Sequence, residues 1–255
     1  MNPLFDLTGR TALITGSSRG LGHAIASGYA AAGARVVING TDAGRVAQAA
    51  QALRAQGRTV FEAPFDVVDE AQVRTAFEAL DAQGVEVDVL VNNAGIQLRK
   101  PIVELQLDEW RKVLDTNLTS AFLVSREAAR RMLARGKGGK IVNIGSLLSE
   151  CGRATIAPYT AAKGGLKMLT RAMTAEWAAQ GIQANAIGPG YMATEMNQAL
   201  MSNPTFDAWV KDRTPAQRWG RPDELVGTAI YLASSASNFV NGQIIYVDGG
   251  FLAVL

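Results

Sequence analysis

The sequence predicts a doubly wound α/β fold, in which helices cover both faces of a seven-stranded parallel sheet. Short apolar segments alternate with amphipathic helical segments along the whole chain, as in a parallel sheet buried on both faces. No Pro- or Ser-rich linker interrupts this alternation, and no internal repeat is visible. The length of 255 residues suits one domain with a substantial core. We therefore expect residues 1–255 to form a single domain.

The expected elements follow one another in a regular order. Apolar segments predict strands at 10–15, 35–39, 59–63, 87–92, 140–145, 183–187 and 243–247. The segments between them predict helices at 24–32, 43–56, 69–83, 108–135, 158–180 and 222–234. In such a sheet, ligands bind outside the carboxyl ends of the strands.

A glycine-rich loop follows the first strand. Gly16, Gly20 and Gly22 form a G-x-x-x-G-x-G pattern between the strand 10–15 and the helix expected from Ala24. Glycines let the backbone turn tightly and approach a pyrophosphate, and the N-terminus of the following helix favours its negative charge. A glycine pattern alone is weak evidence, but a pattern flanked by a strand and a helix predicts a dinucleotide site.

A serine, a tyrosine and a lysine follow the fifth expected strand. Tyr159 and Lys163 are four residues apart and share one face of a predicted helix, while Ser146 lies thirteen residues before Tyr159. A free tyrosine titrates near ~10, and a neighbouring ammonium lowers the pKa of the phenol. Tyr159 could then take the proton from an alcohol or return it to a carbonyl oxygen. A surface Tyr/Lys pair is the alternative interpretation.

The composition argues against several classes of function. The formal net charge is +2 without a long run of like charge, so neither nucleic-acid nor membrane-surface binding is expected. The single cysteine, Cys151, cannot form an intrachain disulfide. The single histidine, His23, gives no support for a histidine-based metal site, and no metal is expected. No signal peptide or membrane span is visible, which predicts a cytoplasmic protein.

These motifs together point to a family. The chain resembles the short-chain dehydrogenase/reductases over essentially its whole length. The resemblance rests on Thr15-Gly16-x-x-x-Gly20-x-Gly22, Asp66-Val67, Asn92-Asn93-Ala94-Gly95, Asn117, Ser146, Tyr159-x-x-x-Lys163 and Pro189-Gly190, in the order and spacing of the family. It implies a Rossmann domain and a reversible hydride transfer with a nicotinamide cofactor.

The resemblance also implies roles for individual residues. Ser146 would position the substrate oxygen, Tyr159 would be the acid or base, and Lys163 would lower the pKa of Tyr159 and bind the nicotinamide ribose. Asn117 would kink the helix 108–135 and hold a water on the proton path from Lys163. The residues expected to bind the cofactor are Gly16, Ser18, Arg19, Gly20, Leu21, Gly22, Thr41, Asp66, Val67, Asn93, Ala94, Gly95, Tyr159, Lys163, Pro189, Gly190 and Thr194.

The end of the second strand bears on the choice between NADP(H) and NAD(H). By the resemblance, Gly40 stands where NAD-using relatives commonly place aspartate, and Thr41 where many NADP users place arginine. No carboxylate at these two positions would repel a 2′-phosphate, and Arg19 could pair with it. Asp42 could still reach the ribose if the backbone were shifted by two residues. We expect NADP(H) to be preferred, with NAD(H) as the alternative.

Charged residues are expected beside the substrate. Arg99 follows the motif 92–95, and Arg153 follows Ser146 by seven residues. Glu150 lies between Ser146 and Arg153 in the sequence. An arginine suits a carboxylate and an acid can bond hydroxyl groups, which favours a sugar acid over a lipid or a steroid. The alternative, which is equal on chemistry alone, is that these charged residues lie at the rim of the site and form ion pairs at the surface. The predicted substrate residues are Ser146, Tyr159, Arg99, Glu150 and Arg153.

Within the family the chain is most similar to gluconate 5-dehydrogenases, which interconvert D-gluconate and 5-keto-D-gluconate. The similar segments are 92–97, 149–153, 167–171, 213–220 and 239–242. Three alternatives stay open. A 3-oxoacyl-carrier-protein reductase would need a basic docking patch, for which Arg130-Arg131 is the candidate. The second alternative is another polyol or sugar dehydrogenase. The third is a non-catalytic nucleotide-binding scaffold, which would have no need of the four predicted catalytic residues Asn117, Ser146, Tyr159 and Lys163.

Two further segments predict features around the site. Residues 191–214 contain three methionines and the pair Asn203-Pro204, and we expect them to form a mobile lid over the substrate. An ordinary helical packing element is the alternative. The chain ends in the apolar residues 251–255, which would be exposed in a monomer. We therefore expect them to pack against a neighbouring subunit of a homotetramer.

Overall fold

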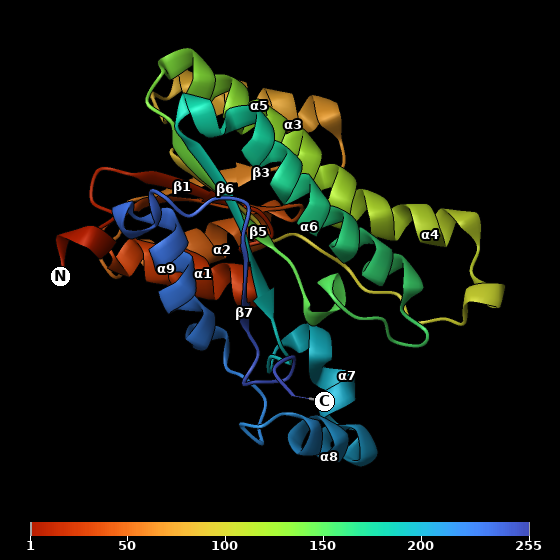
Figure 1. Cartoon of the computed structure of the whole chain (residues 1–255). Helices are drawn as coiled ribbons and strands as arrows, with labels where there is room; N and C mark the ends of the chain where they lie inside the picture. Colours follow the sequence, from red (N-terminus) through yellow and green to blue (C-terminus); the bar gives the residue numbers. More distant parts are fainter. Residues whose placement is uncertain (1, 255) are drawn as a thin grey trace.

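The computed structural model describes residues 2–254 and contains a sheet of seven strands, all paired in parallel (Figure 1). The strand order is β3-β2-β1-β4-β5-β6-β7. The strands are β1 (Thr11–Ile14), β2 (Arg35–Gly40), β3 (Val60–Pro64), β4 (Val89–Asn92), β5 (Gly139–Ile144), β6 (Ile182–Pro189) and β7 (Ile244–Val247). The predicted doubly wound α/β fold is confirmed, because the strand order reverses between β1 and β4.

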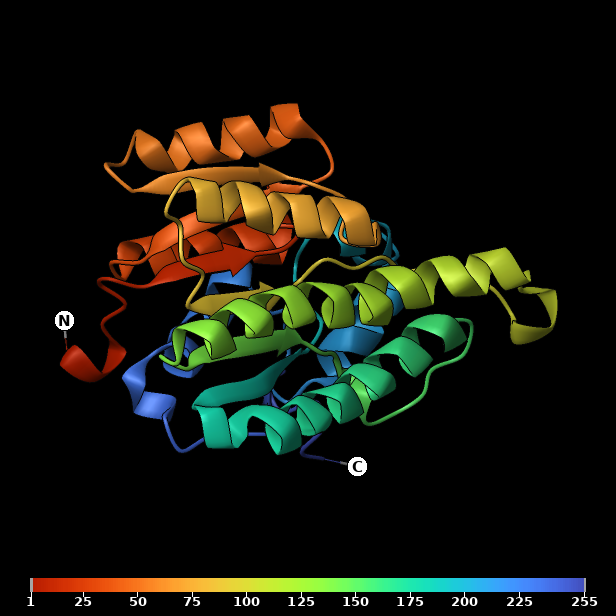
Figure 2. The same cartoon turned by 90° about the horizontal axis from the view of Figure 1, so that it is seen from above.

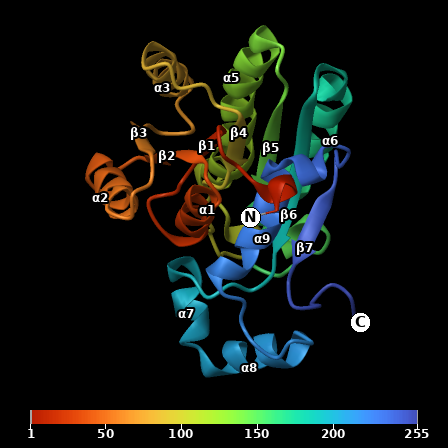
Figure 3. The same cartoon turned by 90° about the vertical axis from the view of Figure 1, so that its left-hand side faces the viewer.

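Helices cover both faces of the sheet (Figure 3). The helices α1 (Gly20–Ala31), α2 (Ala43–Arg54) and α9 (Val226–Ala233) pack on one face, and α3 (Glu70–Ala82), α5 (Ser120–Arg135) and α6 (Ala157–Trp177) pack on the other. Successive strand residues enter different cores, so Ile14 lies with the first group and Leu13 with the second. No helix within residues 2–254 is both long and apolar enough to cross a membrane.

The helix predicted at 108–135 is interrupted by one wider turn. A π-helical turn, Asp115–Thr119, separates α4 (Leu107–Leu114) from α5. Within it, Asn117 Nδ2 donates hydrogen bonds to the carbonyl oxygens of Val113 (2.8 Å) and Ile96 (2.9 Å). A side chain inserted into the backbone ladder produces such a bulge. The expected kink is therefore a local widening, since α4 and α5 stay nearly in line (Figure 2).

Other boundaries differ by a few residues from the predicted ones. Helix α1 begins at Gly20 rather than near Ala24, because the end of the glycine loop already forms the first helical turn. The first turn of the helix predicted at 222–234 is a 3₁₀ turn, Pro222–Leu225, before α9. These differences leave the order of the elements unchanged.

Residues 191–214 form a helical segment at one end of the molecule, beside the C-terminal residues (Figure 1). It contains a 3₁₀ turn, Glu195–Asn197, and the helices α7 (Gln198–Met201) and α8 (Pro204–Arg213). Asn203 caps α8 by accepting a hydrogen bond from the amide of Phe206 (3.1 Å), and Pro204 suits the first helical position.

The C-terminal prediction is wrong in one respect. Phe251 is only 8% exposed, because its ring packs within its own chain against Tyr191 (5.5 Å between ring centroids) and Trp209 (5.9 Å). Val254 is 48% exposed. Leu255 lies outside the described residues.

Candidate active site

The glycine loop is fixed to the end of β4 by hydrogen bonds. Thr15 Oγ1 accepts from the amides of Asn93 (2.9 Å) and Ala94 (3.0 Å), and Asn93 Nδ2 donates to the carbonyl oxygens of Thr15 (2.9 Å) and Gly16 (3.0 Å). Gly16 has φ +60°, and a Cβ at Gly22 would lie 2.4 Å from Asn93 Nδ2. Because neither position accommodates a side chain, both need glycine.

A cleft of about 570 Å³ opens beside this loop, at the carboxyl ends of β1, β2 and β4. Most of the residues predicted to bind a cofactor line it. They are Gly16, Ser18, Arg19, Gly20, Leu21, Thr41, Asp66, Val67, Asn93, Ala94, Gly95, Tyr159, Lys163 and Thr194. Gly22 instead packs behind the loop, and Pro189 and Gly190 line an adjoining pocket.

One end of the cleft carries two arginines. Arg45, which the sequence did not indicate, lines it together with Arg19 and Asp42. Asp42 caps α2 by accepting from the amide of Arg45 (3.0 Å), and its Oδ2 lies 3.2 Å from Arg45 Nε. The carboxylate of Asp42 is therefore already engaged. Arg19 Nη1 lies 2.7 Å from Oε1 of Glu195, so an ion pair links the glycine loop to segment 191–214.

Ser146, Tyr159 and Lys163 come together where the cleft meets the adjoining pocket: Tyr159 and Lys163 line the cleft, and Ser146 and Tyr159 line the pocket. Lys163 is 3% exposed, and its Nζ donates to the carbonyl oxygen of Ile144 (2.6 Å) and lies 5.4 Å from the centroid of the Tyr159 ring. Ser146 caps a short 3₁₀ turn after β5, its Oγ accepting from the amide of Leu148 (3.1 Å). The helix α6 and this cap thus place the three side chains around one point.

Burial determines the protonation states of Tyr159 and Lys163. Burial raises the pKa of Tyr159 by more than the hydrogen bonds to Ser146 and Gln97 lower it. Burial also lowers the pKa of Lys163 to about 8. We expected the ammonium to lower the tyrosine pKa, but desolvation of the phenol dominates. At neutral pH the phenol is therefore protonated, which is the form that can give a proton to a carbonyl oxygen.

Asn117 presents a buried acceptor next to this group. Its Oδ1 has no hydrogen-bond partner in the part of the chain that the structure describes, and both Asn117 and Lys163 line the cleft. A Cβ at Gly95 would lie 2.6 Å from this oxygen. A buried acceptor usually has a donor, so the site suits a bound water or a ligand hydroxyl.

A second pocket of about 300 Å³ adjoins the cleft and shares Tyr159, Gln97 and Thr194 with it. Three arginines line this pocket. They are Arg99 and Arg153, as predicted, and Arg213, which was not. No acidic residue within 2–254 lines it. Burial lowers the pKa of Arg99, and the positive charge of Arg153 lowers it further.

Glu150 is not among the residues that line this pocket. Its carboxylate accepts a hydrogen bond from Tyr246 Oη (2.7 Å) and pairs with Lys167, and these contacts lower the pKa of Glu150. The prediction that Glu150 bonds a substrate hydroxyl is therefore not supported by its position, since Glu150 lies outside the pocket and its Oε1 is held by side chains from β7 and α6.

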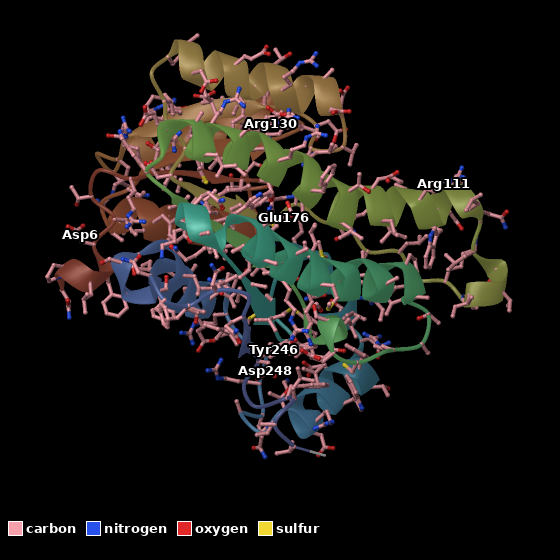
Figure 4. All side chains as sticks on the ribbon, turned by 45° about the horizontal axis from the view of Figure 1, so that its top comes forward. Asp6, Arg111, Arg130, Glu176, Tyr246 and Asp248 are labelled. Carbon is pink, nitrogen blue, oxygen red and sulfur yellow. The ribbon has the colours of Figure 1, made fainter. Side chains whose placement is uncertain are left out.

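The arginines considered for docking an acidic carrier are paired within the chain. Arg130 Nη1 lies 2.7 Å from Glu127 Oε1, and Arg131 Nε lies 2.7 Å from Asp81 Oδ2. Figure 4 shows Arg130 on α5, well away from Tyr246 and Asp248 beside segment 191–214. Within residues 2–254, His, Cys, Asp and Glu side chains form no cluster of three or more that could hold a metal ion.

Comparisons with known proteins agree with this geometry. Residues 16–252 match a family model described as enoyl-(acyl carrier protein) reductase. The chain is 47% identical to the 5-keto-D-gluconate 5-reductase of Escherichia coli, with all of both chains covered. It is 46% identical to the gluconate 5-dehydrogenase of Gluconobacter oxydans, covering 99% of this chain and 98% of the relative.

Solved structures show the same fold. The gluconate 5-dehydrogenase of Burkholderia cenocepacia, solved in complex with NADP and tartrate, is 49% identical with a TM-score of 0.97 and 99% of each chain covered. A solved protein of Agrobacterium tumefaciens shares 67% identity with a TM-score of 0.98, again covering 99% of each chain. The chain therefore belongs to the short-chain dehydrogenase/reductase family of oxidoreductases.

Proposed function

We propose that the protein transfers a hydride reversibly between NADP(H) and the pair D-gluconate and 5-keto-D-gluconate. One observation carries the proposal. The Tyr159 phenol lies where a dinucleotide-sized cleft meets a pocket lined by arginines and free of acids within the described chain. The relatives that are named for this reaction, at 46% and 47% identity, support the same substrate pair.

The cleft fits NADP(H). The glycine loop and the N-terminus of α1 would hold the pyrophosphate. Arg19, Arg45 and Thr41 would take the 2′-phosphate, because the nearby Asp42 is engaged as the cap of α2.

Asp66 and Val67 would lie against the adenine, and the nicotinamide would face Pro189, Gly190 and Thr194. The cofactor, when bound, supplies the hydride.

The protein side chains would supply position and a proton. Arg99 and Arg153 would hold the carboxylate of the sugar acid, and Ser146 would donate a hydrogen bond to the carbonyl oxygen at carbon 5. Tyr159 would give its proton to this oxygen in the reduction and take it back in the oxidation. The Lys163 ammonium would stabilise the phenolate that is left, and Asn117 Oδ1 would hold a water that passes a proton to Lys163.

Residues 191–214 are proposed to be the lid of this site. The segment contributes Thr194 and Met196 to the cleft, and Tyr191, Trp209 and Arg213 to the pocket. A segment that contacts both ligands can shield them from water during the reaction.

A homotetramer is also proposed. The resemblance to the family favours it, and two exposed apolar side chains support it, namely Phe122 on α5 (45% exposed) and Met168 on α6 (57% exposed).

Initial rates with 5-keto-D-gluconate test the proposal, with NADPH and NADH in separate assays. We expect turnover with both substrates of the pair and a clear preference for NADPH, because the cleft offers two arginines to the 2′-phosphate. An acetoacetyl thioester is the comparison substrate for the carrier-protein alternative. A protein that binds NADPH but reduces only the thioester would contradict the sugar-acid assignment and leave the family unchanged.

A further inference from the structure

Arg153 is held at the pocket by two aromatic side chains of segment 191–214. It belongs to the loop between the 3₁₀ turn Leu147–Ser149 and α6, which has no regular structure. Its Cζ lies 4.5 Å from the centroid of the Phe206 ring, and its Nη1 donates to Tyr191 Oη at 3.3 Å. The position of the guanidinium is therefore set from across the pocket and not by its own backbone.

Tyr191 is itself fixed by a cluster of aromatic rings. The rings of Phe206, Trp209, Trp219 and Phe251 surround it at centroid distances of 5.7, 5.8, 5.6 and 5.5 Å. All four meet the Tyr191 ring edge-on, the favoured arrangement for aromatic pairs. A ring packed in this way cannot turn freely, so its hydroxyl keeps one direction. Burial raises the pKa of Tyr191, which keeps this hydroxyl neutral beside the guanidinium.

From this geometry we infer that Tyr191 is a specificity-determining residue, which together with Phe206 orients Arg153 to receive the carboxylate end of the substrate. The inference rests on the proposed function. An arginine that is already oriented loses less conformational freedom when it binds a carboxylate. The acid end of the substrate would then be recognised by segment 191–214 through Arg153, while Ser146 and Tyr159 act on the keto group. Tyr191 is a positioning residue in this account, because it acts through Arg153.

The variant Tyr191→Phe keeps the ring cluster and removes only the hydroxyl. Its kinetics should be compared for 5-keto-D-gluconate and L-sorbose, the neutral ketose that results when the carboxylate is replaced by a hydroxymethyl group. We expect KM for 5-keto-D-gluconate to rise about tenfold, as for loss of a hydrogen bond to a charged group, with kcat nearly unchanged. KM for L-sorbose and the Kd of NADPH should stay as in the wild type. Where L-sorbose turns over slowly, inhibition by D-gluconate and by D-sorbitol gives the same comparison.

Two further variants make the test specific. Tyr246→Phe removes a tyrosine hydroxyl that contacts Glu150 outside the pocket, so it should leave both KM values unchanged. Arg153→Met should raise KM for 5-keto-D-gluconate, and adding Tyr191→Phe to it should raise KM no further, because the hydroxyl acts through the arginine.

Additive effects in the double variant, or an equal rise in KM for L-sorbose, would overturn the inference. So would an unchanged KM in Tyr191→Phe while the wild type reduces 5-keto-D-gluconate. A wild type that binds NADPH and does not reduce 5-keto-D-gluconate would contradict the proposed function itself, which is a different result.

Discussion

Arg19 pairs with one carboxylate in the structure and would face a second negative group in the proposed complex. Its guanidinium is paired with Glu195 at 2.7 Å, and both side chains are largely exposed at the rim of the cleft. In the proposed complex, the 2′-phosphate of NADP(H) would approach the same guanidinium. An exposed ion pair is weak, so the phosphate can displace Glu195 at a small cost, and this cost applies only to the phosphorylated cofactor.

Replacing Glu195 by Gln removes the competing charge and preserves the shape of the side chain. We expect NADPH to bind about two- to fivefold more tightly, the range of an exposed ion pair, and NADH to bind as before. Fluorescence titration with the two cofactors measures both affinities, and Arg19→Met is the matched control that should weaken NADPH alone. An equal change for NADPH and NADH would show that Glu195 does not act through the 2′-phosphate.

The sequence predicted best those residues whose geometry depends on local spacing. Tyr159 and Lys163 share a face in any helix, and the glycine pattern predicts a dinucleotide site wherever it stands between a strand and a helix. Glu150 was misplaced because the hydroxyl that holds it belongs to Tyr246, which is distant in the sequence. Tyr191 was missed for the same reason, since the rings that fix it come from residues 206–251.

At the scale of elements, the alternation of apolar and amphipathic segments was sufficient to predict the seven strands and most helices. It could not show the π-turn Asp115–Thr119, because that turn depends on a bond from Asn117 to Ile96 in another part of the chain. The start of α1 at Gly20 could not be predicted either, because glycine is unfavourable inside helices and the first turn contains both Gly20 and Gly22. The cleft itself follows from the adjacency of β1 and β4, which the doubly wound class already implies.

At the scale of the whole molecule, the proposed homotetramer can be tested by its mass. Light scattering at micromolar concentration should give about four times the 27.0 kDa of one chain, because the exposed side chains of Phe122 on α5 and Met168 on α6 would then be covered. Phe122→Glu combined with Met168→Glu should reduce the mass if these helices form the contact. A wild-type mass of one chain would contradict the proposal.

Tyr159 is proposed to move the proton at the point where the cleft meets the arginine-lined pocket. The most direct test is Tyr159→Phe, assayed for turnover of 5-keto-D-gluconate and for binding of NADPH by fluorescence titration. Because the substitution removes the proton donor and keeps the ring, we predict a fall in kcat of about 10²- to 10⁴-fold with nearly unchanged NADPH affinity. Retained turnover, or an equal loss of turnover and NADPH binding, would contradict the account.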